Sequence, residues 1–286
     1  TPILTFYTLD SFIQPDRVNK VSFRKFSKLE HLLSKYNLLK FSEKILKLIK
    51  WKIRLKPVIA EDKVIPIGKS KIGGNPDLPK DFEWPYWNDR PLSFLLQINI
   101  EEIYEFDFQG IEFEIFPQKN GFLYFFFDYY QEGWGDDGGL SVIYSNEKKN
   151  GLFRTPNPSI YVKHTYRACI LYLLQDVSLP CAGLYSQGKK IKELGFKDSE
   201  WDLYHNGFFK DIFQWDTRWD AHYLFGHPKG IQVVDEHTNR KDNLLLILGD
   251  DKKPGWTWGH GGYIKFWMKD ITKGNFDNVW AEIDCT

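Results

Sequence analysis

The chain has 286 residues, and its 38 basic and 38 acidic residues give a formal net charge of zero. The hydrophobic fraction of 42% and the charged fraction of 27% are ordinary for a globular protein and argue against a disordered chain. No apolar run is long enough to span a bilayer. Three widely spaced cysteines fit neither a disulfide framework nor a zinc site: Cys169, Cys181 and Cys285. We expect a reducing, cytoplasmic location, with a periplasmic one as the alternative.

The zero net charge conceals two oppositely charged parts. Residues 17–56 carry thirteen Lys or Arg and two acids, a net charge of +11, and the rest of the chain carries −11. An asymmetry of this size predicts an electrostatic partner, or docking of the two parts on each other.

The first predicted elements are two helices in a basic N-terminal segment, residues 1–56. Residues 27–30, Ser-Lys-Leu-Glu, form a capping-box pattern, and Asn37 can end the helix that follows. Ser42 can begin the second helix. The apolar residues of each helix share one face: Leu29, Leu32, Leu33 and Tyr36, then Ile45, Leu46 and Ile49. The lysines predict a solvated outer face, with a surface for a membrane or an acidic partner as the alternative.

From about residue 57 the chain changes to short apolar stretches separated by Gly and Pro, as in a strand-rich domain. The expected strands cover residues 94–100, 121–127, 140–144, 168–177, 244–248, 263–268 and 279–283. Residues 189–213 are expected to be partly helical. The sequence therefore predicts a mainly β (α+β) fold behind a helical N-terminal segment.

The expected strands recur in one order. Gly74-Asn75-Pro76 matches Gly226-His227-Pro228 at an offset of 152, residues 95–96 match 245–246 at 150, and residues 121–126 match 262–267 at 141. An alternative pairing sets residues 134–139 against 258–262. Both pairings predict two diverged copies of one unit, at about residues 57–180 and 181–286, that share a core within a domain of residues 57–286.

Two sets of motifs carry a family resemblance. The first set comprises residues 66–79, 82–85 and 91–92 and a strand containing Gln97, and the second comprises residues 226–228, 231–232, 244–246, 258–262 and 275–280. Together they resemble the YwqG-like family, a domain of unknown function, from about Arg54 to the C-terminus. The resemblance implies a cytoplasmic, mostly β fold with a duplicated unit and no established activity.

The resemblance also bears on partners and sites. Some members of the family lie near bacterial polymorphic-toxin genes, which implies an immunity or toxin-neutralising role. The second half departs from the family pattern at three positions: Ile247 stands where Gln is common, His260 where Asp is common and Lys265 where an aromatic residue is common. These departures argue against a ligand site shared with the second units of the family.

Several polar residues are candidates for chemistry. Asp136 and Asp137 lie in a Gly-rich loop after Trp134, which favours a tight hairpin, with binding of calcium or a cationic partner as the alternative. Asp216, Asp220 and His222 have a spacing that would suit a divalent metal, but no known metal motif accompanies them, so a polar loop is the main interpretation.

Two histidines, a cysteine and a set of tryptophans complete the candidates. His227 and His260 with Cys285 would suit acid–base or nucleophilic roles, but no catalytic motif accompanies them, so turn and structural roles are expected. Core packing is the default for the loop tryptophans, and a stacking surface for a sugar or a protein is the alternative. The predicted binding residues are Trp134, Asp136, Asp137, Trp215, Asp216, Trp219, Asp220, Trp256, Trp258 and His260.

These patterns lead to a ranked functional prediction. The leading hypothesis is a non-catalytic protein-binding module of the immunity type, whose acidic body suits a basic toxin partner. A small-ligand or carbohydrate-binding domain and a metal-assisted hydrolase are the alternatives. No catalytic residue, metal or cofactor is expected, and nucleic-acid binding is not expected because no known motif is present.

Overall fold

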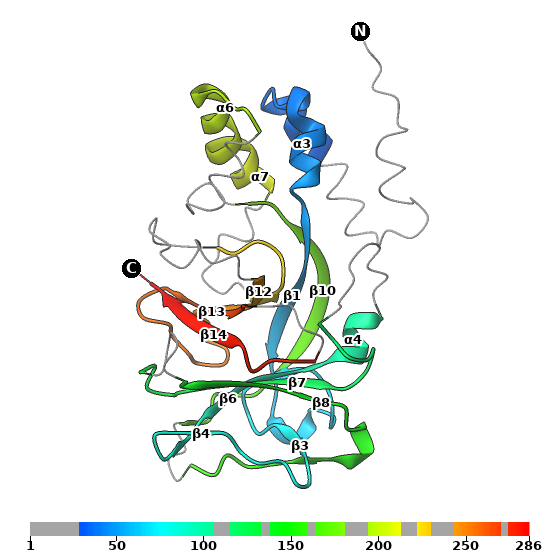
Figure 1. The fold of residues 1–286 in the computed structure, drawn as a ribbon, viewed down its shortest axis with the longest axis vertical. Helices are drawn as coiled ribbons and strands as arrows, with labels where there is room; N and C mark the ends of the chain where they lie inside the picture. The colour runs from blue at the N-terminus through cyan, green and yellow to red at the C-terminus, as the bar shows by residue number, and fades with distance from the viewer. Residues whose placement is uncertain are drawn as a thin grey trace.

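The computed structural model describes residues 29–105, 115–132, 138–159, 164–180, 194–212, 222–229, 243–269 and 274–285. Its strands are β1 (Lys50–Ile59), β2 (Lys71–Ile72), β3 (Asp77–Pro79), β4 (Tyr86–Trp87), β5 (Arg90–Pro91), β6 (Ser93–Asn99), β7 (Phe122–Phe127), β8 (Leu140–Ser145), β9 (Leu152–Arg154), β10 (Cys169–Ser178), β11 (His222–Leu224), β12 (Asn243–Gly249), β13 (Tyr263–Met268) and β14 (Val279–Asp284). The helices are η2 (Leu39–Phe41), α3 (Ser42–Lys47), η3 (Asp62–Val64), α4 (Ile100–Tyr104), η4 (Lys149–Gly151), α6 (Asp198–Asp202), the π-helix η6 (Leu203–Phe209) and α7 (Lys210–Ile212). The predicted mainly β fold with a helical N-terminal segment is confirmed (Figure 1).

Ten strands form one antiparallel sheet whose order repeats the same pattern from both ends. The order is β14-β13-β12-β11-β1-β10-β2-β6-β7-β8. Strands β14, β13, β12 and β11 therefore occupy the places that β8, β7, β6 and β2 occupy in the other half. The outer strands β8 and β14 approach each other, so the sheet is nearly closed.

The strand registers match residue for residue between the two halves. In the first half a bulge at Leu95 precedes the pairing of Leu96 with Phe125. In the second half a bulge at Leu245 precedes the pairing of Leu246 with the equivalent Phe266. The stretches around Leu96 and Leu246 thus occupy equivalent environments, as expected for diverged copies of one unit. The rings of Phe125 and Phe266 meet edge to face at 5.4 Å in the shared core.

The central strands β1 and β10 cross between the halves. They pair over ten residues, and each also pairs with a strand of the other half of the chain: β1 with β11, and β10 with β2. β1 begins at Lys50, inside the segment predicted to be helical, because Trp51, Ile53 and Leu55 alternate with basic residues as in a half-buried strand. The positions of the unit boundaries within the sequence stay a prediction.

A separate helical lobe stands at one end of β1 and β10 (Figure 1). Residues 29–35 are helical, and the predicted end at Asn37 is confirmed by its φ of 56°. The lobe has its own core, formed by apolar residues of the helices and the β10 end: Leu29, Leu32, Leu33, Leu38, Ile45, Leu179, Leu194, Tyr204, Phe208 and Ile212. None of the helices in the described ranges combines the length and apolarity that a membrane crossing requires.

Acids of α6 and α7 receive some of the basic side chains of this lobe. The Lys35 ammonium lies 2.6 Å from Asp211, which also accepts a hydrogen bond from the Tyr36 hydroxyl. Lys40 pairs with Glu200 in the same manner. These pairs join the basic segment to a later part of the chain. Such docking is one of the two outcomes that the charge asymmetry predicts.

Candidate functional site

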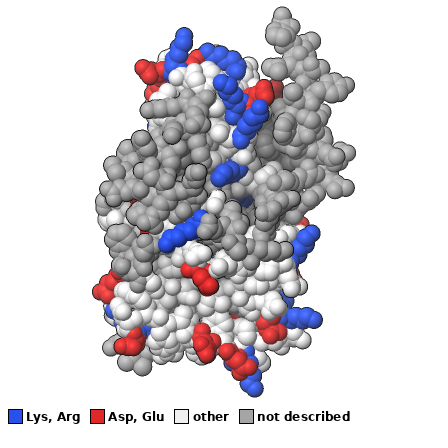
Figure 2. Space-filling model, viewed as in Figure 1, with Lys and Arg blue, Asp and Glu red and all other residues white. Residues whose placement is uncertain are grey.

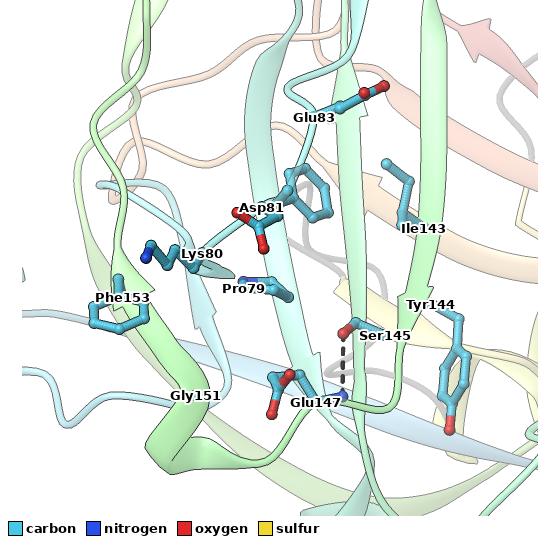
Figure 3. Close-up of a pocket in the computed structure, with 11 residues that line it drawn as sticks. Pro79, Lys80, Asp81, Glu83, Ile143, Tyr144, Ser145, Glu147, Gly151 and Phe153 are labelled. Atoms are coloured by element: carbon cyan, nitrogen blue, oxygen red, sulfur yellow. Dashed lines mark hydrogen bonds between the residues drawn. The ribbon is translucent and has the colours of Figure 1, made fainter.

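An open groove lies on the outer face of the first half. It has a volume of about 760 Å³ and runs between strand β8 and the β3–β9 ribbon. Figure 3 shows Ile143 and Ser145 on the β8 side and Pro79 and Phe153 on the ribbon side. The ring of Phe153 is 55% exposed. The groove therefore offers an accessible aromatic surface beside the edge of the large sheet.

Three carboxylates give the groove an acidic character. Asp81 and Glu83 follow β3, and Glu147 follows β8, with Lys80 as the one basic lining residue. Each of the three acids is exposed, and none takes part in an ion pair within the described residues. Other surface acids are paired: Glu61 lies 2.9 Å from Lys63. The groove thus presents uncompensated negative charge, which attracts a cationic group.

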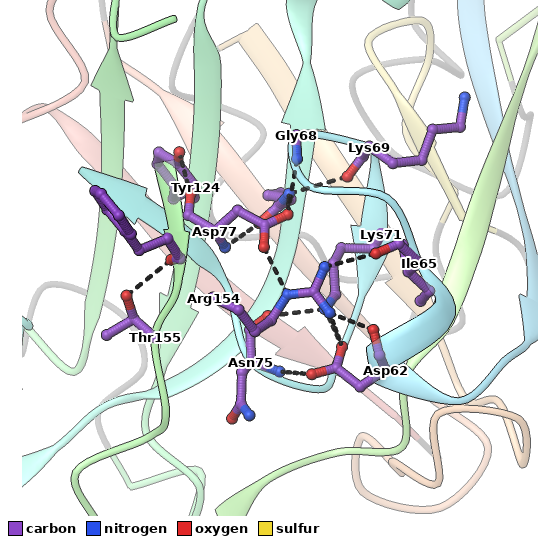
Figure 4. A network of polar contacts seen from close by, with 12 residues as sticks. Asp62, Ile65, Gly68, Lys69, Lys71, Asn75, Asp77, Tyr124, Arg154 and Thr155 are labelled. Atoms are coloured by element: carbon purple, nitrogen blue, oxygen red, sulfur yellow. Dashed lines mark hydrogen bonds and ion pairs between the residues drawn. The ribbon is translucent and has the colours of Figure 1, made fainter. Parts of the chain in front are cut away.

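A buried polar network holds the ribbon wall of the groove in place (Figure 4). Asp77 is fully buried, and its carboxylate accepts hydrogen bonds from the Gly68 N–H (2.9 Å), the Gln97 amide (2.8 Å) and the Arg154 Nε–H (2.6 Å). The Tyr124 hydroxyl donates to the Asp77 carbonyl at 2.6 Å. Because Asp77 lies on β3 and Arg154 on β9, the ion pair fixes the two strands that carry Pro79 and Phe153.

Lys71 extends this network on the side of η3. Its side chain is fully buried and reaches the Asp62 carboxylate and the Asn75 carbonyl. Burial lowers the pKa of Lys71, although Asp62 acts in the opposite direction. Arg154 also donates to the backbone carbonyls of Asp62 and Ile65. Each of these cations is enclosed by acceptors, so the network stabilises the loop of residues 62–79 and does not present a reactive amine.

The second half carries a different buried charge cluster at the equivalent place. Gln97 pairs with Tyr124 across β6 and β7, and the equivalent pair on β12 and β13 is Ile247 with Lys265. The Lys265 ammonium lies 3.1 Å from Glu282 and 2.8 Å from Asp284 on β14. Two of the three departures noted in the sequence therefore form one cross-strand pair. In this pair the uncharged residues Gln97 and Tyr124 are replaced by Ile247 and the charged Lys265.

The structure places three of the predicted binding residues in the loop between β12 and β13. Trp256 and Trp258 are 2% and 0% exposed and pack in the main core, whereas His260 is exposed. Asp250 shapes this loop by accepting hydrogen bonds from the backbone N–H groups of Trp258 (2.6 Å) and Gly261 (3.0 Å). The two buried indole rings pack in the core and present no stacking face to solvent.

The other predicted binding residues lie outside the described residues: Trp134, Asp136, Asp137, Trp215, Asp216, Trp219 and Asp220. Cys181 lies outside them as well. No cluster of three or more potential metal ligands occurs within the described part of the chain.

The remaining candidates for chemistry have structural partners. His222 is buried, accepts from the Gly249 N–H at Nδ1 (3.2 Å) and lies 3.1 Å from Asp251 at Nε2. Both ring nitrogens are thus engaged, which leaves no lone pair for a metal. His227 Nε2–H donates to the Leu48 carbonyl at 2.6 Å and ties the turn to the helical lobe. Cys285 packs against the Gly259 turn.

Comparison with known families places most of this sheet in one domain. A family described as a domain of unknown function, DUF1963, matches residues 70–285. The chain belongs to the DUF1963 family. No curated protein matches the chain. The DUF1963 match spans both halves of the duplicated sheet and begins within the polar network, just before Lys71.

The acidic groove of this DUF1963 domain was not found from the sequence. Its acids come from two segments that are more than 60 residues apart, and each acid alone looks like an ordinary surface residue. The one available signal was the family motif itself, because residues 82–85 follow the motif that ends at Pro79 and include Glu83. The exposed Phe153 gives no such signal.

Proposed function

We propose that this DUF1963 protein is a non-catalytic protein-binding module of the immunity type, which neutralises a basic toxin partner through the acidic groove beside β8. The observation that carries the proposal is the set of exposed carboxylates of Asp81, Glu83 and Glu147, which have no ion-pair partner among the described residues and line the groove together with Phe153. Exposed aromatic rings next to uncompensated charge are typical of protein interfaces, where aromatic anchors supply affinity and charges steer association.

The charge distribution of the whole chain supports the same assignment. Residues 17–56 carry +11 and the remainder −11. Figure 2 shows several Lys and Arg side chains along the helical part with a few acids beside them, and Asp and Glu together with Lys and Arg around the sheet part. A basic partner would be attracted to the sheet, and the rate of its association would fall as salt concentration rises.

We also propose a more specific place for the chain within the DUF1963 family. The motif at residues 66–79 contains the network residues Lys71 and Asp77, and we place the chain with YwqG-like proteins within the DUF1963 family on that basis. We further propose that the protein acts in the bacterial cytoplasm, where an immunity protein meets its toxin.

The test is capture of the product of the neighbouring gene. We expect a complex at micromolar concentration, and protection of cells that co-express the two proteins. The Glu83→Lys/Glu147→Lys variant should weaken the complex at least tenfold, because it reverses the charge of two unpaired groove carboxylates.

A matched control separates the groove from net charge. Glu43→Lys/Glu61→Lys changes the net charge by the same amount at exposed acids outside the groove lining, where single surface pairs contribute little. This control should bind as the wild type does. Absence of a complex and of protection, or equal weakening by the two double variants, would remove the proposal.

A further inference from the structure

The outer face of the central strands β1 and β10 is accessible over the second half of β1. Residues directly opposite each other in an antiparallel pair have their side chains on the same face. Three such pairs form the β1–β10 surface: Arg54 with Leu174, Lys56 with Tyr172 and Val58 with Ile170. None of these six residues is buried, and the exposed fractions of Tyr172 and Val58 are 50% and 41%.

Most other faces of the same sheet are covered. The opposite face of β1 and β10 packs in the main core, for example through Ile53 and Leu171. All residues of β6, β7, β11 and β13 are buried, on whichever face they lie. At the other end of β1 and β10, the turn at Gly226 lies against Lys52 and Ser178. The β1–β10 surface is therefore an accessible stretch of a sheet whose faces are mostly covered.

Apolar and cationic side chains occupy separate columns of the β1–β10 surface. Ile170, Tyr172 and Leu174 follow one another along β10. Alternate residues of a strand are about 6.8 Å apart, so this apolar column extends for about 14 Å. Arg54 and Lys56 lie beside it on β1, opposite uncharged residues. Lys56 is exposed, and no ion pair involves it in the part of the chain that the structure describes.

This arrangement indicates the chemistry of an occupant. An apolar sheet face is buried against a helix or another sheet. An amphipathic helix presents an apolar stripe with polar residues along its sides, and about nine residues of helix match a strip of about 14 Å. Positive charge beside the strip favours acids along the side of that helix and disfavours basic residues there.

Charge argues against two occupants from this chain. Residues 1–28 contain five basic and two acidic residues, so they would bring positive charge to Arg54 and Lys56. A second copy that met the same surface about a twofold axis would bring its own Arg54 and Lys56 to the contact, and like charges repel. A partner with an acidic helix meets neither repulsion.

We infer that the β1–β10 surface binds a partner protein through an acidic amphipathic helix. The apolar stripe of the helix packs on Ile170, Tyr172 and Leu174, and acids along its side face Arg54 and Lys56. The inference goes beyond the proposed function, because none of these residues lines the acidic groove. The two surfaces have opposite charge and recognise partners of opposite charge.

The test uses the full chain and three acetylated, amidated peptides of about 18 residues, long enough to form a helix. The parent peptide has Leu along one helical face, Glu beside this stripe and Ala elsewhere. The second peptide has Gln in place of Glu, and the third has the residues of the parent in an order that removes the stripe. We expect isothermal titration to show at least tenfold tighter binding of the parent than of either other peptide.

A pair of protein variants locates the binding. Lys56→Glu/Tyr172→Ala reverses one charge and removes one exposed ring of the β1–β10 surface. Lys252→Glu/Tyr86→Ala makes the same changes at an exposed lysine and at a tyrosine that is 57% exposed, both outside this surface. We expect the first variant to bind the parent peptide at least tenfold more weakly than the wild type does, and the control variant to bind as the wild type does. Equal affinities of the two variants would overturn the inference.

The remaining outcomes concern other occupants. Absence of parent binding at millimolar concentration, or equal binding of the three peptides, would overturn the inference. Tighter binding of oligothymidylate or of phosphatidylserine vesicles, lost in Lys56→Glu/Tyr172→Ala, would assign the surface to a nucleic acid or a membrane and overturn a protein partner. Self-association of the chain that the same variant abolishes would assign it to a second copy. None of these results bears on the acidic groove, which Glu83→Lys/Glu147→Lys tests separately.

Discussion

Replacing Asp77 with alanine is expected to lower the free energy of unfolding by about 3–5 kcal/mol. The carboxylate is fully buried and accepts from Gly68, Gln97 and Arg154, so its removal leaves a mostly buried guanidinium and two further donors without their acceptor. Loss of one partner of a buried, hydrogen-bonded ion pair is among the most destabilising single changes. Urea denaturation followed by Trp fluorescence measures the change.

Two variants control for this result. Asp81→Ala removes an exposed acid four residues away that has no ion-pair partner in the described part of the chain, and should change stability by less than about 0.5 kcal/mol. Arg154→Ala should resemble Asp77→Ala, and the double variant should cost less than the sum of the two, because both single variants break one pair. Additive effects would show that Asp77 and Arg154 act independently and would contradict the role given to the network.

Replacing Lys265 with methionine is expected to cost about 3–5 kcal/mol of unfolding free energy. The side chain is 2% exposed and forms ion pairs with two acids on β14, so methionine leaves Glu282 and Asp284 without this cation. In the first half the equivalents of these three residues are uncharged: Tyr124, Ile143 and Ser145. The triple variant Lys265→Tyr/Glu282→Ile/Asp284→Ser should therefore recover most of the lost stability.

The same cluster predicts a dependence on alkaline pH. Burial alone would lower the pKa of Lys265, but Glu282 and Asp284 raise it above its ordinary value. A raised pKa in the folded state contributes stability that is fully present below the unfolded value of about 10.4 and is lost as pH rises through the folded value. The wild type should lose stability over this window more steeply than Lys265→Met. Equal slopes would contradict the ionic role of Lys265.

The strands and their repeated order could be predicted from the sequence, because each strand has a strong local pattern. The apolar run around Leu95 and Leu96 predicted a buried strand, and the offset of 150 to Leu245 and Leu246 coincides with the two bulges. Asn37 ended the first helix as predicted, because asparagine tolerates a positive φ better than most residues. Such features depend on a few neighbouring residues, which the sequence displays directly.

β1 shows how a correct signal can be outweighed by composition. Residues 51–57 alternate apolar and basic positions with period two, the pattern of a half-buried strand. The density of lysine in residues 17–56 favoured a single helical segment and hid that alternation. The sequence gives no local signal that β1 pairs with a strand of the second half, because the pairing of β1 with β11 joins residues about 170 positions apart.

The groove and the network depend on contacts that no window of sequence contains. Arg154 meets Asp77 across 77 residues, and Glu147 reaches the groove from a different strand than Glu83. Sequence reasoning took core packing as the default for the loop tryptophans and a binding surface as the alternative, because tryptophan is common at interfaces as well. Burial of Trp256 and Trp258 in the core shows that residue type alone does not decide between packing and recognition.

Hydrogen–deuterium exchange of the chain, with and without the neighbouring-gene product, tests the central claim most directly. The account predicts that residues 80–83 and 146–148, which lie outside the strands and are mostly exposed, exchange rapidly in the free chain. In the complex these two segments beside the acidic groove should exchange at least tenfold more slowly. Protection confined to the helical lobe, with both segments unchanged, would contradict the account.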